Sequence, residues 1–255
     1  MIASISRIKT FKACPKSFFF KYVEGLEPVE KSVALETGSS YHELLEEMYS
    51  NNGEFTQSLT KECAMANDYK KYIYPKFEMV NVEAWYEKKI GKHTLVGRVD
   101  GINDKYIVEH KTSGLDIGDE YEYNLLWNEQ VLAYMSLTGL RKMIYTVCKK
   151  PTIRQKQNET DEEFFDRMCK WYDVDTESKI RMFFVERTDQ EIANFEVDFA
   201  KTCDMIEKTD HMYRNTCNCN MWGRRCEYSS ICLNYNPSQE YVEFTKEDRS
   251  KPYGS

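Results

Sequence analysis

The sequence is poor in the residues that interrupt regular structure and in long apolar runs. Its 255 residues include only 11 glycines and 6 prolines, and no segment is typical of a low-complexity linker. No apolar run approaches the roughly 20 residues that a membrane-spanning helix needs. The opening residues, MIASISRIKTFKACPK, lack the apolar centre of a signal peptide. We therefore expect a cytoplasmic protein without a membrane partner.

Charge alone does not decide the class of ligand. The net charge of −7 argues weakly against binding to nucleic acid. The basic residues are nevertheless grouped, at 7–21, 141–156 and 224–225. A metal site also gathers carboxylates, so an acidic average is compatible with a polyanionic substrate. At 30.2 kDa the chain can bury a large core, as one elaborated domain or as two.

The nine cysteines are not expected to form disulfides, because the cytoplasm keeps thiols reduced. Four of them stand singly in periodic apolar segments and are interpreted as small buried hydrophobic residues: Cys63, Cys148, Cys169 and Cys203. Four others crowd into 16 residues: Cys217, Cys219, Cys226 and Cys232. Crowding of that degree indicates a bound ligand.

Helical and strand patterns alternate along the chain. The helical segments are 4–23 (broken near Cys14 and Pro15), 36–50, 59–77, 124–138, 160–171 and a long helix after the capping box of Thr188 and Glu191. In the segment 124–138 the side chains of Leu125, Leu126, Val131 and Leu137 are expected to face inward. The strand segments are 80–89, 95–102, 106–112, 142–149 and 179–186. This order predicts an α/β fold with a mixed central β-sheet flanked by helices.

The stretch 95–112, LVGRVDGINDKYIVEHKT, contains two of these strands joined by a turn, which form a hairpin. It also contains residues that suit metal-assisted hydrolysis. Glu109 and Lys111 share one face of a strand, and Asp100 lies across the turn, roughly opposite residue 108. Two carboxylates at this distance suit Mg²⁺ or Mn²⁺, which polarises a phosphodiester and lowers the pKa of bound water. The lysine would orient that water or offset transition-state charge. The alternative is a surface hairpin with an ordinary salt bridge, because this pattern often occurs by chance.

Four motifs in this chain resemble those of a nuclease superfamily. GRVD at 97–100 followed by EHK at 109–111 resembles the core of the PD-(D/E)XK nucleases. Upstream, GSSYH at 38–42 matches the G-x-x-x-H motif of the RecB-like branch, and QVLAY at 130–134 matches its Q-x-x-x-Y motif. The motifs stand in the family's order and span most of the first 140 residues. The resemblance implies a restriction-endonuclease-like core.

The resemblance also implies roles for individual residues. It implies metal coordination by the side chains of His42, Asp100 and Glu109 and by the main-chain carbonyl of His110. Lys111 would be the catalytic lysine. A buried core histidine is the alternative for position 42.

Gln130 and Tyr134 form the second pair that the resemblance assigns to the active site. They stand at i and i+4, which places them on one helix face. There they would shape the active site or contact the DNA strand. Ordinary helix surface is the alternative.

The crowded cysteines are spaced too widely for a zinc ribbon, whose knuckles have two to four residues between ligands. Cys219, Cys226 and Cys232 fit one pattern, and Cys14 supplies a fourth ligand if the chain ends meet. The segments SISRIKTFKACPKSFFFKY and RNTCNCNMWGRRCEYSSIC resemble the two ends of iron–sulfur nucleases of the AddB and CRISPR-associated type and of phage relatives. The resemblance implies a [4Fe–4S] cluster in a helical iron–sulfur subregion formed by both chain ends.

Alternatives remain open at this site. Cys217 could replace Cys219 as a ligand. A structural Zn²⁺ is the second choice of metal. Four unrelated buried thiols are the remaining alternative.

A basic loop follows the strand 142–149. Its cationic residues are Lys149, Lys150, Arg154 and Lys156. Phosphate contacts are the functional interpretation, because charge neutralisation supplies most non-specific affinity for DNA. Ordinary solvated loop charge is the alternative.

The sequence and the resemblance together predict a metal-dependent DNA nuclease built as a single domain over 1–255. Its core would cover about 36–210, its cluster-bearing subregion 1–25 and 211–235, and its tail 236–255. An exonuclease acting on linear or single-stranded DNA in recombination, repair or phage DNA processing is favoured by resemblance alone. An endonuclease of this fold and a non-catalytic DNA-binding or scaffold protein are the alternatives. DNA is the expected partner, with a recombinase or single-strand-binding protein beside it, in the host-cell cytoplasm if a phage encodes the protein.

Overall fold

The computed structural model divides the chain into two compact units. The structure describes residues 1–29, 32–221, 224–233 and 244–246. The first unit comprises Met1–Ser32, Glu87–Gly97 and Ala193–Ser255. The second unit comprises Val33–Tyr86 and Arg98–Ile192. The chain passes between the units at the start of one helix, within two long strands and near the start of a second helix, so neither unit is a continuous stretch of sequence.

The second unit is built on a mixed sheet. Its strands are β3 (Asn81–Ile90), β4 (His93–Ile102), β5 (Ile107–Ser113), β6 (Lys142–Lys149) and β7 (Ile180–Glu186). Strand β5 lies between an antiparallel β4 and a parallel β6, β7 follows antiparallel to β6, and β3 pairs with β4. The central strands β5 and β6 are buried almost throughout, as strands covered on both faces must be. The predicted mixed sheet flanked by helices is confirmed.

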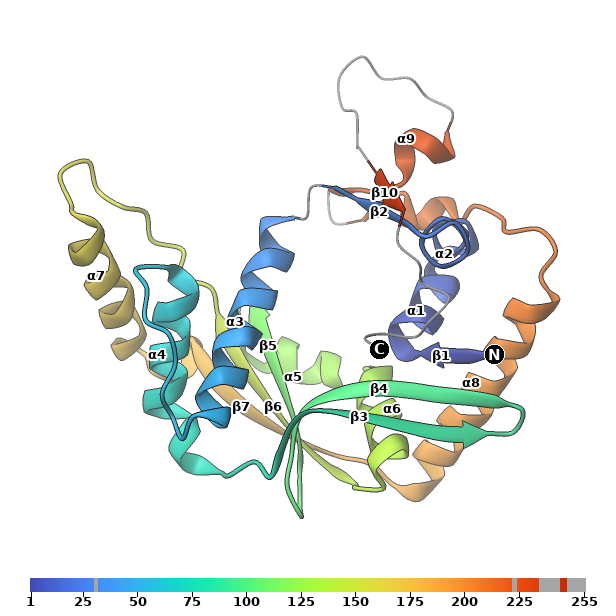
Figure 1. The fold of residues 1–255 in the computed structure, drawn as a ribbon, viewed down its shortest axis with the longest axis horizontal. Coiled ribbons are helices and arrows are strands. Elements are labelled where there is room, and N and C mark those ends of the chain that lie inside the picture. The colour runs from blue at the N-terminus through green and yellow to red at the C-terminus, as the bar shows by residue number, and fades with distance from the viewer. Residues whose placement is uncertain (30–31, 222–223, 234–243, 247–255) are drawn as a thin grey trace. The chain divides into compact units, whose positions relative to one another are not determined.

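Helices cover this sheet. They are α3 (Val33–Ser50), α4 (Lys61–Tyr72), α5 (Asp119–Leu125), α6 (Glu129–Thr138) and α7 (Asp161–Asp173), with single 3₁₀ turns at Tyr74–Lys76 and Thr176–Ser178. Helix α3 packs on β5, α6 packs on β5 and β6, and α4 packs against α3 and α7 (Figure 1). The predicted capping box of Thr160 and Glu163 opens α7, because each satisfies an amide at the helix start.

Asn103 closes the turn between β4 and β5. Its side-chain oxygen accepts hydrogen bonds from the backbone amides of Lys105 and Tyr106. The register pairs Gly101 with Val108. Continuing it places Asp100 opposite position 109, one residue from the expected position. A Cβ at position 101 would lie 1.7 Å from the sulfur of Met79, so a larger residue there would require the Met79 side chain to move.

The predicted helix over 124–138 is two helices, and this expectation was wrong in detail. Helix α5 ends at Leu125, and Asn128 caps α6 by accepting a 3.0 Å hydrogen bond from the amide of Gln130. An asparagine that bonds the backbone locally favours a new helix start over a continuous helix. Leu126, which was expected to face inward, is 54% exposed on the connection.

The first unit contains the remaining elements. They are β1 (Ile2–Ser4), α1 (Ile5–Ala13), α2 (Pro15–Phe18), a π-helical turn (Phe19–Val23), β2 (Leu26–Pro28), most of α8 (Asp189–Lys208), a 3₁₀ turn (Thr216–Asn218), β8 (Asn220–Met221), β9 (Arg224–Arg225), α9 (Ser229–Cys232) and β10 (Phe244–Lys246). Strand β1 pairs in parallel with residues 94–96 of β4. Strands β8 and β9 pair antiparallel, and so do β10 and β2. Pro15 stands at the first position of α2, where its missing N–H has no consequence. The tail 236–255 lies outside the described residues except for β10.

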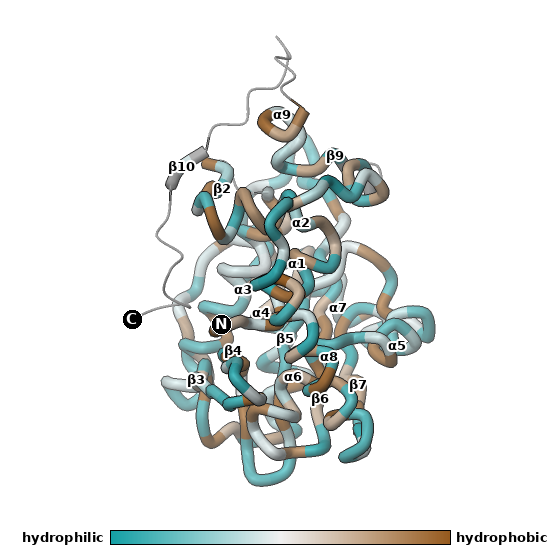
Figure 2. Tube along the Cα trace, turned by 90° about the vertical axis from the view of Figure 1, so that its right-hand side faces the viewer, coloured by the Kyte–Doolittle hydropathy of each residue, from teal (hydrophilic) through white to brown (hydrophobic). Residues whose placement is uncertain are grey.

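The hydropathy of the chain changes over short distances. Figure 2 shows hydrophilic and hydrophobic stretches following one another along the coloured part of the tube. Across the described ranges, no helix combines the length and the apolar character that crossing a bilayer requires.

Candidate active site

The β4–β5 hairpin brings Asp100, Glu109 and Lys111 together. Asp100 and Glu109 are only 8% and 1% exposed. The Lys111 ammonium forms an ion pair with Glu109. The backbone amide of His110 donates a 2.7 Å hydrogen bond to Oδ2 of Asp100, which fixes that carboxylate across the hairpin.

Burial and mutual repulsion perturb both carboxylates. Burial raises the pKa of Asp100 to about 7, although Lys111 and the His110 amide pull it down. Burial and the neighbouring Asp100 raise the pKa of Glu109 to about 7. Burial opposes the charge of Lys111, but the two carboxylates outweigh it and raise its pKa. Two desolvated carboxylates with one lysine form a site whose excess negative charge a divalent cation would neutralise.

His42, from α3, joins the hairpin. Its Nδ1 lies 3.6 Å from Oδ2 of Asp100. Burial and the charge of Lys111 lower the pKa of His42, while Glu109 and the His110 backbone raise it less. A neutral imidazole is the form that binds metal. The His110 carbonyl as a ligand stays a prediction.

A further carboxylate, Glu83 of β3, completes this group. Ligand atoms of His42, Glu83 and Asp100 all lie within 4.8 Å of one another, and this is a set that could hold a metal ion. Glu109 lies next to the set, with its Oε2 buried and without a hydrogen-bond partner among the described residues. An orphaned carboxylate oxygen beside three convergent ligand atoms fits a bound divalent cation.

Glu83 has a strained backbone conformation. Its φ is +52°, which is unusual for a glutamate in a strand and interrupts the alternation of side chains along β3. Its carboxylate is nearly buried and 2.7 Å from Nε of Arg98. Burial raises the pKa of Glu83, and Arg98 lowers it. Sequence reasoning missed Glu83, because strand periodicity does not predict where a residue with positive φ points.

Gln130 and Tyr134 support Glu109 from α6. Nε2 of Gln130 donates to Oε1 of Glu109 at 2.8 Å and to the phenol oxygen of Tyr134 at 3.0 Å. The two residues share a helix face, as their spacing predicts, and that face is turned to the carboxylates. Gln130 therefore holds one oxygen of Glu109, and the other oxygen is the orphaned one.

The opposite face of β5 is packed and offers no access to solvent. The His110 ring is buried, with Nδ1 2.6 Å from Oγ1 of Thr146. Tyr49 stacks on this ring at 6.3 Å, and Tyr69 lies edge-on at 5.3 Å. Burial and the neighbouring His42 hold the pKa of His110 well below its usual range. The ring therefore acts as a rigid support under the hairpin rather than as a titrating group.

The predicted DNA-binding loop begins where β5 and β6 end. Lys149 forms an ion pair with Asp116, and Nζ of Lys150 donates to the Ala34 carbonyl at the start of α3 at 3.0 Å. The Arg154 carbonyl accepts a 2.8 Å hydrogen bond from Arg167. The structure therefore ties three members of this loop to neighbouring elements.

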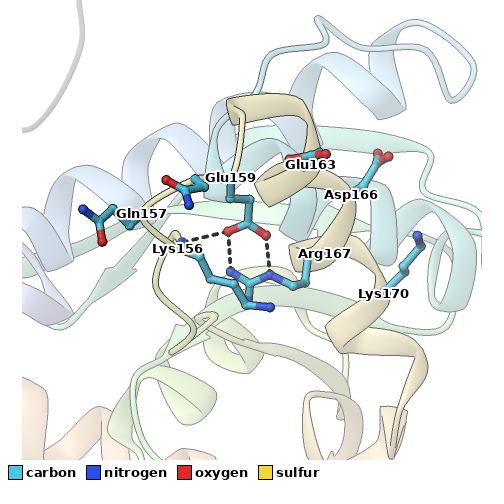
Figure 3. Close-up of a pocket in the computed structure, with 8 residues that line it drawn as sticks. Lys156, Gln157, Glu159, Glu163, Asp166, Arg167 and Lys170 are labelled. Carbon is cyan, nitrogen blue, oxygen red and sulfur yellow. Dashed lines mark hydrogen bonds and ion pairs between the residues drawn. The ribbon is translucent and has the colours of Figure 1, made fainter.

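Lys156 lies farther along, at an open cavity of about 660 Å³ beside α7 (Figure 3). There Arg167 holds Glu159 through two hydrogen bonds of 2.6 and 2.7 Å, and this pairing lowers the pKa of Glu159 to about 2. Arg167 is neutralised by Glu159, and the cationic Lys156 and Lys170 line the cavity together with the acidic Glu163 and Asp166.

The cysteines occupy the first unit. Cys14, Cys219, Cys226 and Cys232 line one cavity of about 220 Å³, whereas Cys217 is exposed and does not line it. The two chain ends meet here, since the amide of Lys16 bonds the Tyr213 carbonyl at 3.0 Å.

Polar groups surround these sulfurs. The amide of Asn215 donates to Sγ of Cys14 at 3.4 Å, and the hydroxyl of Ser17 lies 3.7 Å from Sγ of Cys226. Burial would raise the pKa of Cys14, but hydrogen bonds from Asn215, Ser17 and Lys16 outweigh it and lower that pKa. Amides aimed at a sulfur favour the thiolate, which is the form that binds metal.

Within the described ranges, no three cysteine sulfurs lie within 4.8 Å of one another. The metal group that these sulfurs would hold stays a prediction.

Comparison with known proteins agrees with this fold. Residues 2–73 match the family model of the PD-(D/E)XK nuclease superfamily, a range that includes His42 and ends before the hairpin. A putative exonuclease from Eubacterium rectale shares the fold, with a TM-score of 0.52 and 13% identity over 94% of this chain and 90% of that one.

Two further solved structures are less similar. An alkaline exonuclease from Laribacter hongkongensis gives a TM-score of 0.44 at 14% identity, over 80% of this chain and 87% of that one. A phage-related exonuclease from Haemophilus somnus gives 0.37 at 14% identity, over 74% and 90%. No curated protein matched the sequence. Over residues 2–73 the chain is therefore similar to the PD-(D/E)XK nuclease superfamily, and its fold is shared with the putative exonuclease.

Proposed function

We propose that this protein is a metal-dependent DNA exonuclease that hydrolyses phosphodiester bonds of linear or single-stranded DNA. One observation carries the proposal: His42, Glu83 and Asp100 converge within 4.8 Å beside the orphaned oxygen of Glu109 and the ammonium of Lys111. Metal ligands, a further carboxylate and a lysine are the parts that metal-assisted phosphodiester hydrolysis needs.

The residues of the site would have different roles in the reaction. His42, Glu83, Asp100 and Glu109 would hold Mg²⁺ or Mn²⁺, the metals that PD-(D/E)XK nucleases use. When bound, the metal supplies Lewis acidity toward the phosphate and acidifies its water. Lys111 is positioned to orient the attacking water and to offset the charge that develops on the phosphate.

Supporting residues keep this arrangement in place. Gln130 fixes one oxygen of Glu109, with Tyr134 behind it. The amide of His110 fixes Asp100. Arg98 neutralises Glu83 until a cation does so. Such supports are what hold a site in its reactive geometry.

The DNA backbone is proposed to follow the basic loop. Lys149 ends β6 in register with Ser113, two residues beyond Lys111, and the amide of Lys150 bonds the Ser113 carbonyl. Arg154 and Lys156 follow in the same loop. Lys149 would exchange Asp116 for a phosphate, because an exposed ion pair contributes little. Neutralising phosphates in this way supplies affinity without sequence preference.

One digestion separates this proposal from its alternatives. End-labelled linear DNA and covalently closed circular DNA are incubated with the protein and Mg²⁺ or Mn²⁺, with EDTA as the control. We expect the linear DNA to be degraded from its ends, the circle to stay intact, and EDTA to stop the reaction. Cutting of the circle would instead indicate an endonuclease. Binding without cleavage would indicate a non-catalytic DNA-binding or scaffold protein.

We further propose a [4Fe–4S] cluster on Cys14, Cys219, Cys226 and Cys232, which would fasten the two chain ends of one nuclease domain. The common cavity and the amides directed at Cys14 support it. The exposure of Cys217 favours Cys219 as the ligand.

The cluster is tested on protein purified without oxygen. We expect visible charge-transfer absorbance, about four irons per chain, and loss of both in Cys232→Ser. Cys217→Ser is the matched control and should keep them. One tightly bound zinc per chain and no iron would contradict the assignment.

A further inference from the structure

Three large side chains stand exposed at the end of α5 and on its connection to α6. Tyr123, Leu126 and Trp127 are 55%, 54% and 72% exposed. The rings of Tyr123 and Trp127 lie edge-to-face with their centroids 6.4 Å apart. We call residues 123–127 the aromatic turn. A grouped apolar surface of this kind marks a site of contact with another molecule.

The aromatic turn is held in place rather than loose. The amide of Leu126 bonds the Tyr123 carbonyl at 3.1 Å, and the amide of Asn128 bonds the Leu125 carbonyl at 3.2 Å. The buried guanidinium of Arg187 donates to the carbonyls of Leu125 and Leu126, at 2.9 and 3.3 Å. A pre-ordered surface loses little conformational entropy when a ligand binds.

The turn adjoins the candidate active site. Trp127 is three residues from Gln130, whose side chain bonds Glu109. At about 3.8 Å per residue, the Cα atoms of Trp127 and Gln130 are at most about 11 Å apart, a length that a few nucleotides span. On the other side of the turn, burial raises the pKa of Tyr121, and the charges of Lys111 and Glu109 also act on it.

The chemistry of this segment suits bases and not phosphates. Residues 119–129 contain four acidic side chains and no lysine, arginine or histidine. The guanidinium of Arg181 lies 4.0 Å from Asp119 and 3.6 Å from Glu122, so these two carboxylates already engage it. A phosphate backbone would be repelled here, whereas an aromatic face accepts any base by stacking.

We propose that the aromatic turn binds unpaired bases of the DNA strand whose phosphate lies at the active site. This inference rests on the proposed nuclease function and adds a substrate preference to it, namely for single-stranded or frayed ends. The backbone of the bound strand then faces the basic loop, and its bases face Tyr123 and Trp127.

Binding in EDTA tests the inference without cleavage. Anisotropy of a fluorescein-labelled oligodeoxythymidine and of a labelled blunt duplex is measured with the wild type, Trp127→Ala and Phe184→Ala. We expect Trp127→Ala to bind the single strand on the order of tenfold more weakly, with little change for the blunt duplex. Phe184, an aromatic residue 65% exposed on β7, is the matched control and should show no change. Trp127→Phe should restore most of the affinity.

The outcomes separate this inference from the proposed function. If the wild type cleaves DNA with Mn²⁺ and Trp127→Ala binds the single strand as tightly as the wild type, only the inference is wrong. If the wild type binds the oligonucleotide at Trp127 and never cleaves it, only the proposed function is wrong. A loss of self-association in Trp127→Ala, with unchanged affinity for DNA, would assign the turn to a contact between copies and overturn the inference.

Discussion

Asp100→Asn is expected to stabilise the metal-free protein while it removes activity. The folded protein raises the pKa of Asp100 from 3.8 to about 7, chiefly by burial. Each unit corresponds to 1.36 kcal/mol, so holding this carboxylate ionised costs up to about 4 kcal/mol at pH 8. Asparagine keeps the oxygen that accepts the His110 amide and carries no charge. The free energy of unfolding should therefore increase in the variant.

The sign of the pH dependence follows from linkage. Because the folded pKa is raised, the folded state binds the proton more tightly than the unfolded state does. The destabilisation by Asp100 is absent below pH 4, amounts to about 1.5 kcal/mol at pH 5, and reaches its full value above pH 7. The stabilisation by Asp100→Asn should grow over that same range.

Urea unfolding in EDTA at pH 5 and pH 8 measures this difference. Asp104→Asn, an exposed position in the turn of the same hairpin, is the matched control and should change little. Adding Mn²⁺ at about 100 times its Kd should stabilise the wild type by about 2.7 kcal/mol and leave Asp100→Asn unchanged. A variant that is less stable than the wild type at pH 8 in EDTA, or a gain that does not grow with pH, would refute the reasoning.

Three further predictions follow from the same groups. Glu83→Gln should weaken Mn²⁺ binding by about ten- to a hundredfold in a titration followed by electron paramagnetic resonance, and an unchanged Kd would exclude Glu83 as a ligand. Affinity for Mn²⁺ should rise between pH 6 and pH 8, because the cation must displace protons from Asp100 and Glu109, whose pKa values are raised to about 7; a flat profile in the same titration contradicts this. Asp68→Asn should raise the unfolding free energy by about 2 kcal/mol at pH 8 and far less at pH 4, because burial raises the pKa of Asp68 to about 7, and equal urea midpoints would contradict it.

The elements of the fold were predictable because their signals are local. Alternation predicts the strands, capping boxes predict the starts of α7 and α8, and the turn residues of the hairpin place its two strands. The motifs then predicted which side chains meet: Asp100, Glu109 and Lys111 on the hairpin, with His42 from α3. The register of the hairpin differs by one residue from the expected register, because turn length sets the register and the strand pattern does not.

Other features depend on tertiary structure and could not be predicted. The side chain of Glu83 is turned toward the site by a positive φ, and a glutamate in a strand pattern gives no sign of that backbone conformation. Leu126 fits the apolar stripe of a continuous helix. Its side chain is nevertheless exposed, because Asn128 caps a new helix and the buried Arg187 binds the Leu126 carbonyl. Which three of the crowded cysteines share a cavity with Cys14 depends on how the chain ends fold, and spacing left both Cys217 and Cys219 open.

The most direct test of the account is the rate of label release from linear DNA by Lys111→Ala, measured with Mn²⁺ beside the wild type and Asp104→Asn. The account predicts a loss of at least about a hundredfold in Lys111→Ala, because Lys111 offsets charge that develops only in the transition state. Asp104→Asn should keep the wild-type rate, and EDTA should stop both. Wild-type cleavage by a pure preparation of Lys111→Ala would contradict the assignment of this hairpin as the catalytic site.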